Sequence, residues 1–260
     1  MSFPDPRAAA LPGNVTADIG VFGGSGLYRL LDDATEHHLT TPYGDPPPVT
    51  VGSVAGRRVA FLPRHGPHHE LGPHQVNYRA NAWIMAALRV GAVLGPCAAG
   101  SLQRHVAPGH VVVCDQLVDL TKRRIDTFQD GAGVRHLSFA DPYDPALRAA
   151  AVAACRAQGV TVHDGGTVVV IAGPRFATRA ESSSYRAQGW DVINMTQCPE
   201  AALIAELDVA YAAIALVTDY DSGVPGEPGT PPVTQDEVFA VFERNLGAVR
   251  RVLFHAIELL

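Results

Sequence analysis

The chain lacks a surplus of basic residues. Its 260 residues contain 20 Lys and Arg against 26 Asp and Glu, a formal net charge of −6, and the longest basic run is Lys122-Arg123-Arg124. Binding to the phosphate backbone of a nucleic acid depends on clustered positive charge. The charge balance therefore argues against a nucleic-acid partner and favours a small molecule or a protein.

Membrane segments and a cysteine framework are also missing. No apolar run reaches the roughly 18 residues that span a bilayer. The N-terminus has an early acid and two prolines where a signal peptide would have its apolar core. The four cysteines, at positions 97, 114, 155 and 198, show no Cys-x-x-Cys spacing. Cysteines scattered in this way predict reduced, buried side chains in a cytoplasmic protein with no membrane partner.

Several frequent ligand-binding motifs are absent as well. Gly23-Gly24-Ser25-Gly26 follows an apolar run, but a dinucleotide fingerprint would need a further glycine where Arg29 stands, and a P-loop would need Gly-Lys-Ser/Thr. The histidine-rich stretch from His65 to His74 lacks the helical His-Glu-x-x-His spacing, and its Gly-Pro pairs interrupt any helix. These residues favour neither a dinucleotide site nor a metal site.

What the sequence does contain is an alternation of apolar runs and helical periodicity. With 47% hydrophobic and 18% charged residues, the chain is long enough for one large α/β domain, which we place at residues 17–260 after a loose tail at 1–16. The alternation predicts a mostly parallel sheet flanked by helices. The predicted strands include 49–54, 57–62, 92–98, 110–118 and 167–172, and the predicted helices are 75–88, 145–158, 178–188, 199–207 and 234–259.

Polar groups gather immediately after the predicted strands. In open α/β sheets, ligands bind outside the carboxyl ends of the strands, so we expect these groups to share one site. Arg64 offers a planar fork of donors for phosphate or carboxylate, and His65 can add a donor that also carries charge. The sequence thus predicts an anion site there, and a polar loop around Arg123 and Arg124 is expected near a site mouth or a subunit contact. The strand ends in question are Gly23 to Ser25, Arg64-His65, Ala98 to Gly100, Phe176, Met195-Thr196 and Asp219.

Six ordered motifs resemble the trimeric purine nucleoside phosphorylases, and among them most closely the members that act on 5′-methylthioadenosine. The motifs are GGSGL (23–27), LPRHG (62–66), AAGSL (98–102), GPRFATRAES (173–182), DVINMTQCPEA (191–201) and VTDYD (217–221). The resemblance implies a single-domain α/β fold with a mixed sheet, a homotrimer, orthophosphate as co-substrate, and no metal or organic cofactor.

The same resemblance implies roles for individual residues. Phe176 would border the purine, and Asp219 and Asp221 would face its N7 and 6-substituent as the catalytic groups. His136 would reach the 5′ end of the sugar in a neighbouring subunit. The remaining contacts would be Ser25, Arg64, His65, Ala98 and Thr196 for phosphate, Met195 for ribose, and Gln235, Val238 and Phe239 for the 5′ substituent.

Asp219 bears on both the chemistry and the choice of purine. Glycosidic cleavage builds negative charge on the leaving purine, so a carboxyl that protonates N7 must itself be protonated, which requires a raised pKa in a desolvated pocket. Family members that use 6-oxopurines have Glu after Gly-Pro-x-Phe and a later Asn, where this chain has Ala177 and Asp219. A carboxylate accepts a hydrogen bond from an exocyclic amine. The resemblance therefore implies phosphorolysis of 5′-methylthioadenosine to adenine and 5-methylthioribose 1-phosphate.

Three alternatives remain open. The first is a phosphorylase of adenosine, inosine or 5′-methylthioinosine, because Gln235 can hydrogen-bond a 5′-hydroxyl, whereas Val238 and Phe239 suit a methylthio group. The second is a non-catalytic purine- or phosphate-binding protein that keeps the fold. The third is a metal-dependent hydrolase built on the histidine cluster. In addition, Cys97 stands where the family often has a hydroxyl residue, so one phosphate donor is expected to be absent.

Overall fold

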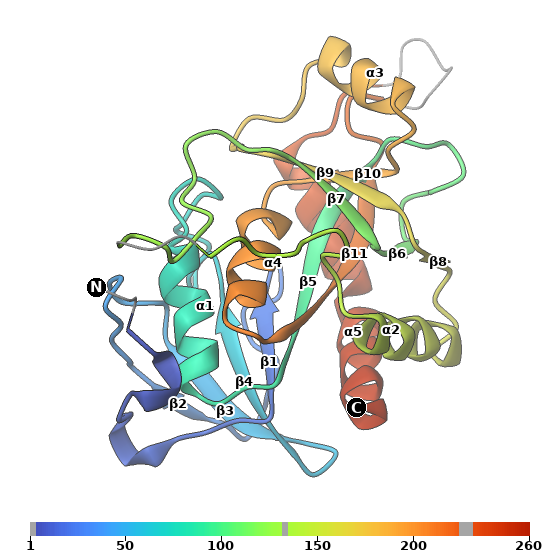
Figure 1. Cartoon of the computed structure of the whole chain (residues 1–260). Helices are drawn as coiled ribbons and strands as arrows, with labels where there is room; N and C mark the ends of the chain where they lie inside the picture. The colour runs from blue at the N-terminus through green and yellow to red at the C-terminus, as the bar shows by residue number, and fades with distance from the viewer. Residues whose placement is uncertain (1–3, 132–134, 224–230) are drawn as a thin grey trace.

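The chain, described here from a computed structural model over residues 4–131, 135–223 and 231–260, contains an 11-stranded sheet within those residues (Figure 1). Parallel pairings outnumber antiparallel ones in it, which confirms the predicted α/β class with a mixed, largely parallel sheet. The strands are β1 (Ile19–Gly23), β2 (Thr35–His37), β3 (Val49–Val54), β4 (Arg57–Pro63), β5 (Ala92–Ser101), β6 (Val111–Val113), β7 (Gln116–Leu120), β8 (Val162–Asp164), β9 (Thr167–Ile171), β10 (Val192–Asn194) and β11 (Ala210–Asp219).

The centre of the sheet is a parallel set, β4, β1, β5 and β11, so the carboxyl ends of these four strands lie at one edge. β10 runs against β5, and its first residue, Val192, pairs with Ser101 at the end of β5. The residues that follow β10 therefore return over the middle of β5. Because β10 is only three residues long, its end at Asn194 still lies beside the carboxyl-terminal part of β5.

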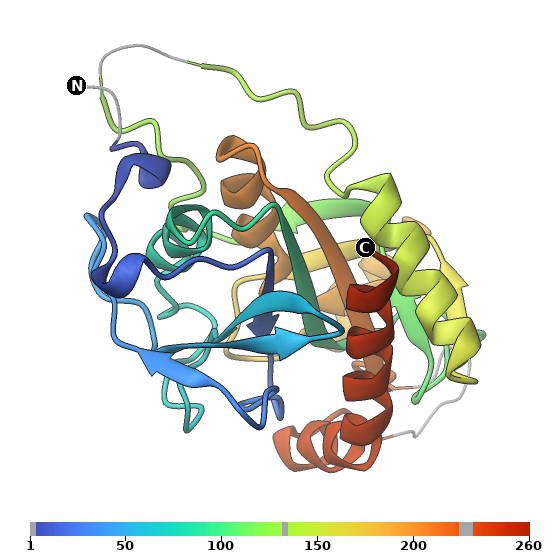
Figure 2. The same ribbon diagram turned by 90° about the horizontal axis from the view of Figure 1, so that it is seen from below.

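Helices cover both faces of the sheet (Figures 1 and 2). On one face α1 (Tyr78–Ala87) packs against α4 (Gln197–Glu206), and on the other α2 (Pro145–Ala157) packs against α5 (Gln235–Leu259). Buried small and apolar residues such as Ala82, Ala86 and Leu203 fill the first layer, and Ala151, Val252 and Leu253 belong to the second. The short α3 (Arg179–Ala187) lies beyond the end of β9, where Thr178 and Glu181 form a capping box.

One predicted strand is wrong in its extent. The apolar run 110–118 forms two strands, β6 and β7, separated at Cys114 and Asp115. The Asp115 carboxylate accepts a hydrogen bond from the Gly166 N–H at 2.8 Å. After this point the chain changes neighbours: β6 pairs with β11 and β8, and β7 pairs with β9. Sequence periodicity reports burial and not which strand is adjacent, so it does not register this change.

The segment predicted as a loose tail, residues 1–16, is described from Pro4 onward. It forms two short 3-10 helices, Pro6–Ala8 and Pro12–Asn14, and the Trp83 indole on α1 donates to the Pro4 carbonyl at 3.2 Å. Residues 1–3 lie outside the described part of the chain. No helix among the described residues is both long and apolar enough to cross a lipid bilayer.

Candidate active site

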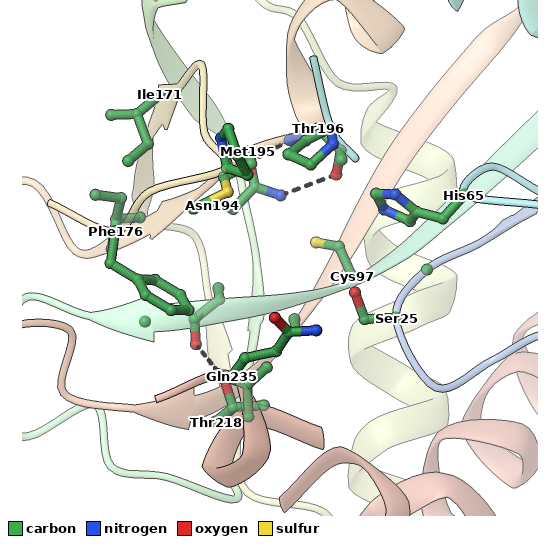
Figure 3. Close-up of a pocket in the computed structure, with 18 of the residues that line it drawn as sticks. Ser25, His65, Cys97, Ile171, Phe176, Asn194, Met195, Thr196, Thr218 and Gln235 are labelled. Carbon is green, nitrogen blue, oxygen red and sulfur yellow. Dashed lines mark hydrogen bonds between the residues drawn. The ribbon is translucent and has the colours of Figure 1, made fainter. Parts of the chain in front are cut away.

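The predicted strand-end residues line one pocket with a cavity volume of about 290 Å³. In Figure 3 Ser25, His65 and Thr196 lie at one end of it, and Phe176 and Ile171 lie at the other. Most of the residues expected at the site are therefore brought together. The sequence-predicted residues that line the pocket are Ser25, Arg64, His65, Ala98, Phe176, Met195, Thr196, Asp219, Asp221, Gln235, Val238 and Phe239.

The end with Ser25 and Thr196 offers hydrogen-bond donors to an anion. Thr196 is 6% exposed, and Asn194 at the end of β10 holds it in place. The Asn194 side chain donates to Thr196 Oγ1 at 3.3 Å and accepts from the Thr196 N–H at 3.2 Å. Gly24 allows this end to close tightly, because a Cβ there would meet the Pro96 carbonyl oxygen at 2.8 Å and Arg64 NH1 at 2.9 Å. Cys97 lies between Ser25 and Thr196 in the place of a stronger donor.

Arg64 borders the same end, but a carboxylate already pairs with it. The guanidinium is 1% exposed and binds Glu200 of α4 in a bidentate pair, through Nε and through NH2 at 2.9 Å. NH1 also donates to the Pro96 carbonyl at 3.0 Å, and Tyr211 donates its hydroxyl hydrogen to Glu200 at 2.9 Å. One N–H remains on each terminal nitrogen for a ligand. The charge of Arg64 is therefore balanced within the protein.

His65 is a neutral ring in this setting. Burial and the neighbouring Arg64 lower its pKa to about 3. Its Nδ1 lies 2.8 Å from the Leu71 carbonyl oxygen, which can only accept, so Nδ1 carries the proton and Nε2 is the acceptor of the neutral ring. His65 was expected as a donor able to carry charge. In the structure it can donate through Nε2 only after it gains a proton.

We predict that the free protein shows no titration of His65 between pH 5.5 and 8. The lowered pKa keeps the ring neutral throughout that range, since it becomes charged only as the pH falls toward about 3. The measurement is a ¹H–¹³C NMR titration of the histidine ring signals, with His65→Asn used to assign the His65 signal and His38, which is well exposed, as an internal comparison. A His65 midpoint near the ordinary value of about 6.5 would contradict the prediction.

Two carboxyl groups, Asp219 and Asp221, lie at the purine end expected from the sequence. Asp219 Oδ2 accepts from the Thr218 hydroxyl at 2.7 Å, and its Oδ1 accepts from the Asp221 N–H at 2.7 Å. Burial raises the pKa of Asp219 to about 6, although both hydrogen bonds act in the opposite direction. A Cβ on Gly100 would lie 2.9 Å from Asp219 Oδ1, so glycine leaves the space that this carboxyl occupies.

Asp221 has an unsatisfied acceptor. The residue is 3% exposed, and among the described residues its Oδ2 has no hydrogen-bond partner. Burial raises the pKa of this carboxyl as well, although the nearby Ser182 side chain and the Ser222 backbone act in the opposite direction. A buried acceptor without a partner is costly, and a ligand donor such as an exocyclic amine can satisfy it. Phe176 is 36% exposed and offers an apolar surface for a planar ring nearby.

The first turns of α5 close a third side of the pocket. Thr234 caps this helix by accepting from the Glu237 N–H, which fixes the start of α5 at Gln235. Phe239 packs edge-on against His69 with ring centroids 5.2 Å apart, and the amide of Gln235 points into the pocket (Figure 3). The pocket wall formed by α5 therefore combines one amide with the apolar side chains of Val238 and Phe239.

His136 does not line the pocket of its own chain. It is exposed on the segment that precedes α2. Its expected contribution to a neighbouring subunit stays a prediction. In the part of the chain that the structure describes, no three His, Cys, Asp or Glu side chains are grouped to hold a metal ion.

Three residues with clear structural roles at the site, Glu200, Tyr211 and Asn194, were not assigned to it by the sequence reasoning, and Arg124 was expected only as part of a polar loop near a site mouth or a subunit contact. Glu200 and Tyr211 support Arg64, Asn194 orients Thr196, and Arg124 donates to three backbone carbonyls behind the pocket. Only Glu200 carries a signal in the sequence, as a single acid before the apolar run Ala201 to Ile204. The pairing partners of the other three are decided by the fold.

Comparisons with known proteins cover nearly the whole chain. A model of the Phosphorylase superfamily matches residues 18–258. A purine nucleoside phosphorylase from Streptomyces coelicolor is 50% identical over 255 residues, which are 95% of this chain and 90% of that protein. An S-methyl-5′-thioadenosine phosphorylase from Mycobacterium tuberculosis is 51% identical over 242 residues, 92% of this chain and 88% of that protein. Methylthioadenosine phosphorylase from Schistosoma mansoni in complex with adenine superposes with a TM-score of 0.89 at 34% identity, covering 94% of this chain and 92% of that chain.

Proposed function

The chain belongs to the Phosphorylase superfamily, and from this premise we propose that it catalyses the phosphorolysis of 5′-methylthioadenosine to adenine and 5-methylthioribose 1-phosphate. The family resemblance drawn from the six motifs is confirmed, and the protein is a nucleoside phosphorylase. The proposal includes a cytoplasmic homotrimer that needs orthophosphate and neither a metal nor an organic cofactor.

The observation that carries the proposal is the arrangement of the pocket ends. Donors for an anion, from Ser25, Thr196 and the free N–H groups of Arg64, face a purine end with a buried carboxyl whose pKa is raised to about 6. Glycosidic cleavage by phosphate needs an anion beneath the sugar carbon that becomes positive and a proton donor at the purine nitrogen that becomes negative. The pocket offers donors for the anion at one end and a proton donor for the purine at the other.

The roles of the residues follow from this arrangement. Phosphate lies against Ser25, His65, Ala98 and Thr196 and attacks C1′ while Met195 contacts the sugar. Protonated Asp219 donates to N7 as the bond breaks, and Asp221 accepts from the 6-amino group through Oδ2, which accepts no hydrogen bond of ordinary geometry from the described residues. An amine at position 6 satisfies that oxygen, whereas a 6-oxo group would face it as a second acceptor. Adenine nucleosides are therefore favoured.

A second candidate, a purine nucleoside phosphorylase with a preference for a 5′-hydroxyl, is favoured by one observation. Gln235 directs its amide into the pocket beside Val238 and Phe239 (Figure 3). The amide can hydrogen-bond a hydroxyl, while the two apolar side chains suit a methylthio group. The Streptomyces coelicolor relative is named a purine nucleoside phosphorylase, and the Mycobacterium tuberculosis relative is named for S-methyl-5′-thioadenosine.

Purine release from 5′-methylthioadenosine, adenosine, inosine and 5′-methylthioinosine, each with and without orthophosphate, separates the two candidates. We expect phosphate-dependent adenine release, fastest with 5′-methylthioadenosine. Gln235→Leu should lower kcat/KM for adenosine by about tenfold, because the lost hydrogen bond favours only the hydroxyl substrate. The same variant should leave 5′-methylthioadenosine within about threefold of wild type. Fastest release from inosine or 5′-methylthioinosine would contradict the role given to Asp221.

A further inference from the structure

A cation behind the pocket has no carboxylate partner in the part of the chain that the structure describes. Arg124, on the segment between β7 and α2, forms no ion pair with any described residue. Arg64, by contrast, is balanced by Glu200. The unbalanced positive charge near the phosphate end therefore belongs to Arg124.

Arg124 also connects two chain segments that border the pocket. Its NH1 donates to the carbonyls of Met195 and Cys198, both at 2.7 Å, and its NH2 donates to the carbonyl of Ala172 at 2.7 Å. Met195 lines the pocket, Ala172 directly follows β9, and Cys198 lies at the start of α4. Met195 and Cys198 belong to one stretch that runs from the end of β10 into the start of α4, and Ala172 belongs to the segment after β9. One planar guanidinium thus fixes their relative positions.

A fourth contact joins Arg124 to helix α1. The guanidinium carbon lies 5.1 Å from the centre of the Tyr78 ring on α1, and the Tyr78 hydroxyl donates to the carbonyl of Pro73, which lines the pocket. A cation over an aromatic face is held there electrostatically. The Nε of Arg124 is buried without a partner among the described residues, although the side chain as a whole is half-buried.

We propose that Arg124 is a positioning residue of the phosphate site, which holds the Met195-Thr196 loop against the end of β9 and supplies the positive charge that Arg64 lacks. The charge reaches the site, since Arg124 is among the groups that lower the pKa of His65. Carbonyl acceptors attract the guanidinium without cancelling its charge, as a carboxylate would. The inference rests on the proposed function, because it takes orthophosphate as the ligand.

The test compares two substitutions of Arg124 with one neighbour. Arg124→Gln removes the charge, and Arg124→Lys keeps the charge but cannot reach three carbonyls from one ammonium group. Lys122→Gln, an exposed position on the same segment, removes an equal charge as a control. Steady-state KM for orthophosphate, KM for the nucleoside and kcat are measured for each protein. Calorimetric titration with orthophosphate alone gives its Kd without turnover, and thermal unfolding reports whether each variant folds.

We expect Arg124→Gln to raise both KM and Kd for orthophosphate by about 10- to 100-fold, because an attraction of several RT is lost in a poorly hydrated site. The nucleoside KM should change by less than about threefold. Arg124→Lys should recover most of the phosphate affinity but show a lower kcat, because the loop is no longer held. Lys122→Gln should match wild type within about twofold in kcat, in both KM values and in the Kd for orthophosphate.

Two results would overturn the proposal. One is a phosphate Kd within about twofold of wild type in both Arg124 variants, accompanied only by a lower unfolding temperature. The other is an equal rise in the phosphate and nucleoside KM values. If Arg124→Gln does not fold, Arg124→Met takes its place as the variant without charge: a rise in the phosphate Kd of about tenfold or more supports the proposal, and a Kd within about twofold of wild type overturns it. If wild type binds orthophosphate but releases no purine, the proposed function fails while Kd still decides the role of Arg124; if it binds none, both fail.

Discussion

Replacing Asp219 with asparagine is expected to lower kcat/KM for 5′-methylthioadenosine by about 10²- to 10⁴-fold, the range for loss of a positioned general acid. An amide can donate a hydrogen bond to N7 but cannot transfer the proton, so the purine would leave as an anion. The measurement is phosphate-dependent adenine release. Asp141→Asn, a change at an exposed acid outside the pocket, serves as the matched control and should stay within about twofold of wild type.

The loss should be chemical and not structural, because an amide fits the hydrogen bonds around Asp219. Its oxygen can accept from the Asp221 N–H, as Oδ1 does now at 2.7 Å. Its NH₂ can donate to Thr218 Oγ1, which still donates to the Ala99 carbonyl at 3.3 Å. Both present contacts therefore have a counterpart in Asp219→Asn.

The structure predicts in which direction kcat/KM changes with pH. Burial raises the pKa of Asp219 from 3.8 to about 6, and the active form is the protonated one, so kcat/KM should fall as the pH rises through about 6. Asp219→Asn should lack this limb of the profile. A wild-type profile that instead rises through pH 6 would contradict the assignment of Asp219 as the acid.

The same shift predicts that the variant gains stability at alkaline pH. Between the unfolded value of 3.8 and the folded value of about 6, the folded state binds more protons, so stability is lost as the pH rises. The shift corresponds to at most about 3 kcal/mol, and partial exposure reduces it. Asp219→Asn should therefore unfold with a free energy about 1 to 3 kcal/mol higher than wild type at pH 8 and no higher at pH 4. Urea unfolding at the two pH values checks this, and an equal difference at both would contradict it.

The second large effect is expected at the ion pair between Arg64 and Glu200. Glu200→Gln should lower the free energy of unfolding by about 3 to 5 kcal/mol, because it leaves the guanidinium buried without a countercharge. Arg64 and Glu200 are 1% and 2% exposed, so water cannot replace the lost partner. Urea unfolding measures the change. Tyr211→Phe removes only one hydrogen bond to Glu200 and should cost about 1 kcal/mol.

A combined variant separates stability from function at this pair. Arg64→Met, Glu200→Leu and Tyr211→Phe together remove the charges and the hydroxyl at once, and replacement of a buried ion pair by apolar residues is often neutral for stability. We expect the combined variant to recover most of the free energy lost in Glu200→Gln. Its kcat/KM for orthophosphate should nevertheless fall by about 10²-fold or more, because the two free N–H groups of Arg64 are gone. A combined variant less stable than Glu200→Gln would show that the pair is a net source of stability.

Local chemistry allowed much of the fold to be predicted. The strands β3 and β4, the helix α3 with its capping box, and α5 beginning after Thr234 follow from apolar patterning and capping residues that act within a few positions. The break at Asp115 was missed because it depends on a contact with Gly166, which lies on a different strand connection. The strands β2 and β8 were missed too, because each has only three residues, too few to show the alternation of apolar and polar side chains that marks a strand.

The composition of the pocket was predictable for a similar reason. Parallel strands end at one edge, so strand-end residues such as Ser25, His65 and Asp219 could be assigned to one site from order alone. The requirement for a raised pKa at Asp219 follows from the chemistry, but its cause is burial in the folded pocket. The family likewise follows from six ordered motifs, which are properties of the sequence.

The sequence by itself thus determined the fold class, the family and most of the groups that meet at the site. Only the tertiary structure decided which of those groups are paired, which are protonated and which hydrogen-bond partners they have. Arg64 and Glu200 are 136 positions apart, the proton on His65 is placed by the Leu71 carbonyl, and Arg124 is distinguished from Arg123 by three carbonyls on distant segments. Charge, protonation and donor direction depend on which groups lie within a few ångströms and on how much water is excluded, and folding alone brings those groups together.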